Sequence, residues 1–424
     1  MASTTSVPSA PTLGPPGQVV RQAARLWGER AYLWGAGTVG GNRVARLFLP
    51  PTQRNPYPLY EEFRRQGPLV QANFGPMAMT VTTSHAIAGA VLRNRAFVVG
   101  PDSSPDFGIH LSLLELNPPD HTRLRRLVMP AFSPKRIAGL ESMITTTVHR
   151  LLDDAERAGS FDLVAALAEP LPVTVITELL GIPADDHTRF LEHGGAIAGA
   201  LDGVRSISHA RRLLRAETEL GEIFTRLFEL RRHEPREDLV TDLVAAGDAA
   251  APEELTSLCL LLLVAGFETT VNLIGSTVLA LQRSGQWAMV VEDPNLATAA
   301  VEETLRHDPP VQLTGRHASS DVEVEGHLIP AGTAVIPLIG ATGRDPEVFD
   351  RPDVYDLTRS HQGDHLAFSA GAHYCIGAPL ARLEATIAVR ELATRLPRLA
   401  STGRVRMRQS TTLRGPASMP VKVV

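Results

Sequence analysis

Apolar residues recur every three or four positions over most of residues 118–307, which is the spacing of α-helices. Strict alternation of apolar and polar residues is confined to short runs. The two clearest runs, Leu69–Phe74 and Ala78–Thr83, are separated by Gly75-Pro76, and this arrangement predicts a β-hairpin. Strand-like segments return near residues 320–338. The pattern therefore predicts a large, mainly α-helical body with a small β-rich part at its edge.

Several individual helices are predicted by the same pattern. Pro58–Arg65 and Ser84–Arg93 have helical spacing on either side of the predicted hairpin. Asn117-Pro118 predicts a helix start, because Asn caps free N–H groups and Pro suits the first helical position. The apolar run Leu255–Leu281 predicts a long core helix, and Ala378–Leu392 predicts a further helix near the C-terminal end.

No linker rich in Pro, Gly or Ser divides the interior of the 424-residue chain, so we expect one large domain over residues 56–424. Residues 1–18 have the composition of a disordered segment. Residues 19–55 are expected to form an amphipathic extension. Its first part, residues 19–34, interleaves apolar residues and two tryptophans with arginines, which is typical of a helix on a membrane surface or of a helix packed on the domain itself.

Composition excludes several classes of protein. Charged residues make up 21% of the chain and the formal net charge is −5, which argues against nucleic acid as a partner. The only cysteines, Cys259 and Cys375, cannot form a disulfide framework or a zinc cluster. No apolar run reaches the roughly 20 residues of a transmembrane span, and no signal peptide is visible. We therefore expect a cytoplasmic protein.

Cys375 carries the most informative motif of the chain. The motif is F-x-x-G-x-H-x-C-x-G, formed by Phe368, Gly371, His373, Cys375 and Gly377. Two glycines indicate positive-φ turns that let the backbone approach a flat group. The following helix places free N–H groups beside the sulfur and favours a thiolate, which is a strong axial ligand for a haem iron. A buried structural cysteine is the alternative, but it explains neither the glycines nor the histidine.

The centre of the predicted helix Leu255–Leu281 is unusual because it contains Gly and polar residues. A glycine inside a helix costs roughly 1 kcal/mol relative to Ala, so Gly266 indicates a close approach by another group. The Thr269 hydroxyl can bond back to the Ala265 carbonyl and loosen the helix. Together with Glu268, these residues could receive a diatomic ligand and deliver protons to it. A kinked core helix with incidental polar residues is the alternative interpretation.

Charged residues fall on shared helix faces at two further places. His121 and Arg125 are spaced to grip carboxylates, hypothetically those of a haem, although an exposed basic helix would show the same spacing. Glu303 and Arg306 are close enough to form an ion pair. Arg316 follows at the start of an extended segment.

In this order, the motifs resemble those of the cytochrome P450 family of haem-thiolate monooxygenases, in particular its soluble bacterial members, over residues 56–424. The resemblance implies a mainly α fold with a triangular-prism helical body and a long central helix over the haem. It implies haem b, iron protoporphyrin IX, with Cys375 as the axial iron ligand and Phe368 packed beneath the ring. The implied partners of the haem propionates are His121, Arg125, Arg316 and His373.

The resemblance also implies the reaction and its partners. O₂ would be activated with electrons from a separate ferredoxin and ferredoxin reductase, and an apolar small molecule would be hydroxylated or epoxidised. Glu268 and Thr269 look like the proton-relay pair, and Ala265 and Gly266 would line the oxygen pocket. Two residues, Val311 and Leu313, would lie near the substrate. The ferredoxin would meet a basic surface of Arg123, Arg126, Lys135 and Arg382.

Two other functions stay open at this point. A haem-binding sensor or carrier would need Cys375 but not Glu268 and Thr269. A peroxide-driven enzyme of the same fold would commonly alter that acid–alcohol pair, which is intact in this chain. The expected lid segments, residues 99–117 and roughly 184–210, mix apolar and acidic residues, which favours a moderately large apolar substrate such as a lipid, terpenoid, steroid or secondary metabolite.

The chain departs from the family pattern at two positions. Val354 stands where the family usually has Arg or His, a cation that joins the Glu303–Arg306 pair. We expect Arg351 to replace that cation from a nearby turn. Gly343 stands where Asn is usual, and we expect only a local backbone effect.

Overall fold

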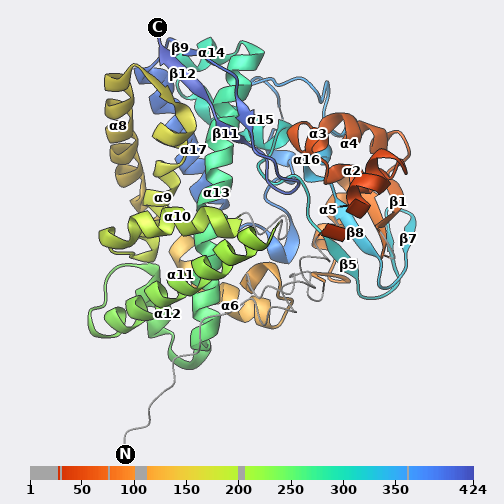
Figure 1. The fold of residues 1–424 in the computed structure, drawn as a ribbon, viewed down its shortest axis with the longest axis horizontal. Helices are drawn as coiled ribbons and strands as arrows, with labels where there is room; N and C mark the ends of the chain where they lie inside the picture. Colours follow the sequence, from red (N-terminus) through yellow and green to blue (C-terminus); the bar gives the residue numbers. More distant parts are fainter. Residues whose placement is uncertain (1–26, 29–30, 75–76, 101–111, 199–205, 361) are drawn as a thin grey trace, which may run out of the picture.

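The computed structural model describes residues 27–28, 31–74, 77–100, 112–198, 206–360 and 362–424 (Figure 1). A helical body and a smaller β-rich lobe lie side by side. This arrangement confirms the predicted mainly α fold with a small β-rich part.

The helix α13 (Pro252–Ser284) passes through the middle of the helical body and is its main packing element (Figure 1). It confirms the long helix predicted from the apolar run. Glu254 accepts a 2.9 Å hydrogen bond from the Ala251 N–H at its start, and Gly285 ends it with a φ of 72°. By length and composition α13 could cross a membrane, but it is mostly buried inside the protein, which is typical of a core helix.

Helices from both halves of the chain pack around α13, and their apolar faces form the largest core cluster. For example, Ile144, Val148 and Leu152 are buried at intervals of four residues along one face of α8 (Glu141–Ala158). The surrounding helices are α6 (Asp120–Val128), α7 (Pro134–Gly139), α8 (Glu141–Ala158), α9 (Pro170–Leu180), α10 (His187–Ala198), α11 (Ile207–His233), α12 (Leu239–Ala245), α14 (Trp287–Glu292), α15 (Leu296–His307) and α17 (Ala378–Arg395).

The β-rich lobe is built on a five-stranded sheet with the strand order β1-β2-β8-β5-β3. Only the β2–β8 pair is parallel. The strands are β1 (Leu69–Phe74), β2 (Met77–Thr82), β3 (Phe97–Val98), β5 (Arg316–Ala318) and β8 (Ala334–Pro337). Short helices complete the lobe, namely α2 (Arg43–Leu47), α3 (Pro50–Arg54), α4 (Tyr57–Arg64), α5 (His85–Arg93) and α16 (Ile339–Thr342).

Three small sheets accompany the main one. Strands β4 (Ser160–Asp162), β12 (Pro420–Val423) and β9 (Leu399–Ser401) form one, and its central strand comes from the C-terminal end of the chain. The other two are pairs: β6 (Val322–Val324) with β7 (His327–Ile329), and β10 (Arg406–Met407) with β11 (Pro416–Ser418).

The predicted hairpin is confirmed, because β1 and β2 pair from Leu69 opposite Thr82 to Phe74 opposite Met77. The predicted start of the helix after Asn117 was wrong, since α6 begins at Asp120. The Asn117 side chain instead bonds the N–H and the carbonyl of Val99 at 2.9 Å each, so it ties two loops together and is not available as a cap.

The packed core reaches back before residue 56. Val44 and Leu47 of α2 are buried against Leu59 and Tyr60 of α4. The domain boundary expected at residue 55 therefore lies inside this cluster. Within the expected amphipathic segment 19–34, Trp27 and Trp34 are 76% and 63% exposed. Residues 1–18, expected to be disordered, lie outside the described residues.

A buried charge network ties α15 to the loop that follows α16. Glu303 and Arg306 form the predicted ion pair at 2.7 Å, and both side chains are fully buried. Arg306 also donates to the carbonyls of Gly343 and Val354 at 2.7 and 3.0 Å. A side chain at Gly343 would overlap the Arg306 carbonyl oxygen, so the absence of a side chain there is part of this packing.

The third member of the network is Arg359, and the prediction of Arg351 was wrong. The Arg359 Nε lies 3.3 Å from a Glu303 oxygen, and its guanidinium donates to the Val354 carbonyl at 2.9 Å. The Arg351 side chain is 63% exposed and pairs with Asp350 and Asp356. Because Arg351 has these partners at the surface, its guanidinium stays in contact with solvent.

We predict that Arg359→Ala lowers the stability of the protein by roughly 1–3 kcal/mol, because the buried Glu303 carboxylate loses one of its cations. Arg351→Ala should change stability by less than about 0.5 kcal/mol, because its ion pairs are exposed. Thermal unfolding followed by circular dichroism measures both variants. Equal midpoints for the two variants would contradict this assignment.

Candidate functional site

The loop before α17 holds Cys375 in a tightly packed turn. The Cys375 N–H donates to the Phe368 carbonyl at 2.9 Å. Gly371 has a φ of 68°, and a side chain there would collide with the Leu92 carbonyl of α5. The predicted positive φ is thus confirmed at Gly371. It was wrong for Gly377, which has a φ of −83°.

Cys375 keeps exposed surface although it lies deep among protein atoms, so it faces an interior hollow. Burial raises the pKa of the Cys375 thiol, while the N–H groups of Gly377 and Ala378 and the charge of Arg125 lower it. The net direction is upward. The helix N-terminus therefore offsets only part of the loss of solvation, and a bound metal ion would favour the thiolate.

The middle of α13 also faces an open space. Ala265 is exposed and Thr269 half-buried, while Val264 and Phe267 beside them are buried. An exposed residue at the centre of a buried core helix must line an interior hollow. The Thr269 hydroxyl donates to the Ala265 carbonyl at 2.7 Å, which confirms the predicted backbone bond. Gly266 lies where α9 comes close, with Ile176 3.0 Å from the position of an added Cβ.

Glu268 and Thr269 are sequence neighbours, but their side chains have different partners. Glu268 is buried and forms a 2.6 Å ion pair with Arg408, which follows β10. The Arg408 Nε also donates to the Asn272 side-chain oxygen at 2.9 Å. Burial raises the pKa of Glu268, and Arg408 acts in the opposite direction. No sequence pattern pointed to Arg408, which lies between β10 and β11, far along the chain from Glu268.

The four residues predicted to hold propionates converge from three parts of the chain. The rings of His121 and His373 lie 4.3 Å apart, and Arg125 donates to the Tyr374 carbonyl at 2.7 Å. Arg316 is 6% exposed and, among the described residues, bonds only Thr314 and Gly315 of its own segment. Burial, reinforced by Arg316, His121 and Arg125, lowers the pKa of His373 to about 4. Burial also lowers the pKa of Arg316 and of His121.

This cluster fits the carboxylates of a haem. In the described part of the chain, no carboxylate forms an ion pair with Arg125 or Arg316. A buried guanidinium without a counter-charge is costly, so the cluster requires an anion. The thiol of Cys375, which couples electrostatically to Arg125, lies next to it. Cations for carboxylates, a sulfur ligand and a helix with a small-residue centre are the groups that haem ligation needs.

The remaining predicted residues lie around this cluster. Phe368 packs against the main core, with the Arg382 guanidinium 4.5 Å from its ring centre. Val311 bridges to Leu413, and Leu313 packs against the core of the β-rich lobe. Of the four residues in the expected ferredoxin surface, Arg126 and Lys135 are exposed. Arg123 pairs with Glu254 at 2.6 Å and Arg382 pairs with Glu302 at 2.5 Å, which reduces the positive charge of that surface.

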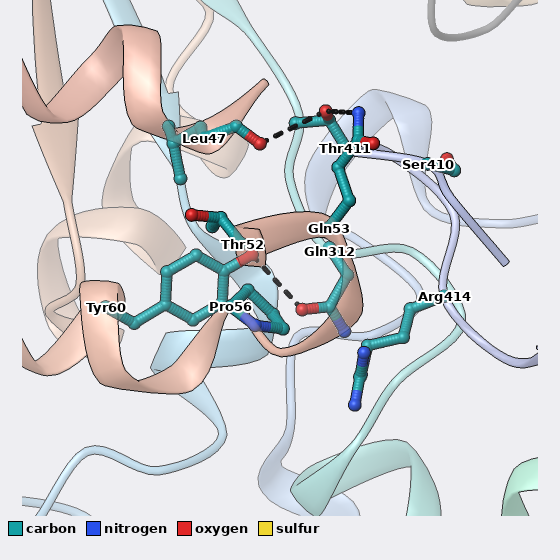
Figure 2. Close-up of a pocket in the computed structure, with 9 residues that line it drawn as sticks. All are labelled: Leu47, Thr52, Gln53, Pro56, Tyr60, Gln312, Ser410, Thr411 and Arg414. Atoms are coloured by element: carbon teal, nitrogen blue, oxygen red, sulfur yellow. Dashed lines mark hydrogen bonds between the residues drawn. The ribbon is translucent and has the colours of Figure 1, made fainter. Parts of the chain in front are cut away.

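Figure 2 shows a separate small pocket between the N-terminal helices and the C-terminal segment. The Tyr60 hydroxyl and Gln312 bond at 3.1 Å, and Gln53 donates to the Thr411 hydroxyl at 3.2 Å (Figure 2). The polar groups of this pocket largely form hydrogen bonds with one another. The pocket lies where residues 47–60 meet residues 410–414, and it shares no residue with the Cys375 site. The lining residues are Leu47, Thr52, Gln53, Pro56, Tyr60, Gln312, Ser410, Thr411 and Arg414.

Comparison with known proteins agrees with this geometry. The family model "Cytochrome P450" matches residues 276–396. Cytochrome P450 107B1 of Saccharopolyspora erythraea is 42% identical over 330 residues, 76% of this chain and 79% of that protein. The biotin biosynthesis cytochrome P450 of Bacillus subtilis is 36% identical over 373 residues, 85% of this chain and 93% of that protein.

Solved structures extend the likeness to the fold. The crystal structure of P450BioI, in complex with an acyl carrier protein ligated to hexadec-9Z-enoic acid, has a TM-score of 0.83 at 35% identity and covers 88% of this chain and 100% of that one. Ligand-free CYP164A2 of Mycobacterium smegmatis has a TM-score of 0.81 at 39% identity, covering 90% and 99%. With relatives this similar over nearly their whole length, the chain belongs to the cytochrome P450 family of haem-thiolate monooxygenases.

Proposed function

We propose that this monooxygenase binds haem b through Cys375 and oxidises a long-chain apolar substrate with electrons from a ferredoxin and its reductase. The observation that carries the proposal is the convergence of Arg125, the buried Arg316 and two histidines beside a thiol that faces an interior hollow. When bound, haem supplies the activation of O₂ and the insertion of one oxygen atom into the substrate. The protein is then expected to act in the cytoplasm.

The residues around Cys375 would hold the cofactor and tune its ligand. Arg125 and Arg316 would bind the two carboxylates and so gain the counter-charge that they lack, and His121 and His373 would donate hydrogen bonds to the same carboxylates. The N–H groups of Gly377 and Ala378 would stabilise negative charge on the sulfur. Phe368 would shield the sulfur from water.

The residues at the centre of α13 would handle protons. The Thr269 hydroxyl donates to the Ala265 carbonyl, so its oxygen is available to accept a hydrogen bond from water in the hollow. Burial raises the pKa of Glu268, which favours a carboxyl that can take up a proton as well as release one. Its ion pair with Arg408 would have to open for the proton to pass.

Substrate class and electron donor are supported less directly. The structural neighbour P450BioI was solved with a hexadecenoic acyl group on a carrier protein, and this likeness favours a long acyl chain among apolar substrates. Electrons would come from a separate ferredoxin, which would meet Arg126 and Lys135 near the Cys375 side. A sensor or carrier would not need Thr269 in the hollow, and a peroxide-driven enzyme would not need the Glu268–Thr269 pair.

Cys375→Ser should abolish the red-shifted Soret band that carbon monoxide gives with thiolate-ligated ferrous haem, because the sulfur donor is lost. Product formation driven by NADH through a surrogate ferredoxin system should fall at least 100-fold, by analogy with loss of an essential group. The matched control is Cys259→Ala, since Cys259 is buried within α13. An unchanged spectrum in Cys375→Ser would rule out this ligand.

Thr269→Ala should uncouple electron use from product, because water in the hollow loses the hydroxyl that orders it. We expect NADH consumption within about threefold of the parent enzyme and product per NADH lower by about tenfold. Thr270→Ala is the control, because the Thr270 hydroxyl is buried and bonds only the Gly266 carbonyl at 3.1 Å. Coupling that is equal in both variants would refute the relay role.

Arg316→Leu should weaken haem binding while it stabilises the haem-free protein. The substitution removes a buried cation that has no counter-charge until the carboxylates arrive. We expect haem to transfer to apomyoglobin about tenfold faster or more than from the parent protein, and Arg316→Lys to restore part of the retention. A haem-free protein that is destabilised, with haem transfer unchanged, would show that Arg316 is only structural.

A further inference from the structure

The N-terminal half of α11 carries a cluster of exposed arginines. Arg211, Arg212 and Arg215 are spaced so that they share one face of the helix. None of the three forms an ion pair or a hydrogen bond with any residue that the structure describes. The next turns of the same face present Glu219 and Glu222, so the positive cluster is confined to the beginning of α11.

This placement is unfavourable for the isolated protein. Arg211 and Arg215 are four residues apart, a spacing at which like charges repel each other. Arg212 and Arg215 are three residues apart and repel each other in the same way. Glu219 does not relieve the repulsion through an ion pair with Arg215, because it pairs with His193 of α10 at 2.8 Å. Uncompensated local conflicts of this kind are expected where a surface serves a partner.

The cluster belongs to the pair of helices that lies over the centre of α13. Helices α10 and α11 pack on each other and both contact α13 (Figure 1). A Cβ added at Gly194 of α10 would lie 2.7 Å from the Phe267 ring, next to Glu268 and Thr269. The arginines therefore lie on the helix pair that packs against the Phe267 side of α13.

The chemistry of the surface favours an acidic protein as its partner. Among the side chains that the structure describes, none of the exposed large apolar ones belongs to α10, α11 or α12. A membrane-binding helix would need such side chains to enter the lipid. Exposed arginines in a polar surrounding instead suit carboxylates of another protein, which steer association and fix its orientation.

We propose that Arg211, Arg212 and Arg215 form the docking surface for an acidic carrier protein that presents the substrate as a tethered acyl chain. The inference rests on the proposed oxidation of a long-chain substrate and names how that substrate is delivered. A ferredoxin is expected to dock at a different surface, because its electrons should enter near Cys375.

The test uses the haem-loaded, full-length enzyme with all three arginines changed to glutamate. Its matched control changes Arg398, Arg404 and Arg406 to glutamate, which are exposed residues near β9 and β10 and give the same change in net charge. The probes are an acyl carrier protein carrying a hexadecanoyl chain, free hexadecanoic acid, a reduced ferredoxin and vesicles of phosphatidylglycerol. Binding of the acyl probes is read from the Soret shift, and carrier-protein association also from surface plasmon resonance.

We expect the Arg211/Arg212/Arg215 variant to bind the acyl carrier protein at least about tenfold more weakly than the parent enzyme, with free hexadecanoic acid bound equally well. The control variant should bind the carrier protein like the parent, and the parent affinity should fall with salt. The melting temperature of the docking variant, compared with that of the control variant, checks that the fold is intact, because the three glutamates repel one another as the arginines did.

Four outcomes would overturn the docking proposal. They are no carrier-protein binding by the parent enzyme, equal weakening in both variants, loss of ferredoxin reduction in the docking variant alone, and loss of vesicle binding in the docking variant alone. Each leaves the proposed oxidation intact as long as free hexadecanoic acid still shifts the Soret band. If neither acyl probe shifts that band in the parent enzyme, the proposed substrate class fails, and the docking proposal fails with it.

Discussion

Uncompensated charge in the protein interior is the constraint on which the rest of this structure depends. Arg125 and Arg316 lie around Cys375 without a carboxylate partner in the described residues, and burial raises the pKa of the Cys375 thiol. Each of these groups is unfavourable alone. A flat, apolar cofactor with two carboxylates and a metal ion would supply the anions for the cations and the charge that makes the sulfur a thiolate. The site is thus complementary to haem, which would supply the anions and the metal ion that these side chains lack.

Several buried charges have their counter-charges within the protein itself. Glu303 lies between Arg306 and Arg359, which also donate to backbone carbonyls of the loop after α16. Glu268 has Arg408, and Arg408 has Asn272. Arg316, by contrast, is buried without a carboxylate partner among the described residues.

The sequence predicted the parts of the site that depend on local spacing. The Cys375 loop, the Thr269 bond to Ala265 and the Glu303–Arg306 pair each involve residues a few positions apart, so helix and turn geometry determines them. Long-range partners were missed. Arg359 reaches Glu303 and Arg408 reaches Glu268 only because the fold brings distant segments together. Asn117 looked like a cap because spacing alone could not reveal its bonds to Val99.

The central claim is that the Cys375 sulfur is the ligand of a haem iron. X-ray absorption at the iron edge of the purified, haem-loaded protein tests it most directly, because the method reports which elements surround the metal. The account predicts one sulfur in the first coordination shell of the iron, and its loss in Cys375→Ser but not in Cys259→Ala. A first shell of nitrogen and oxygen alone in the parent protein would contradict the account.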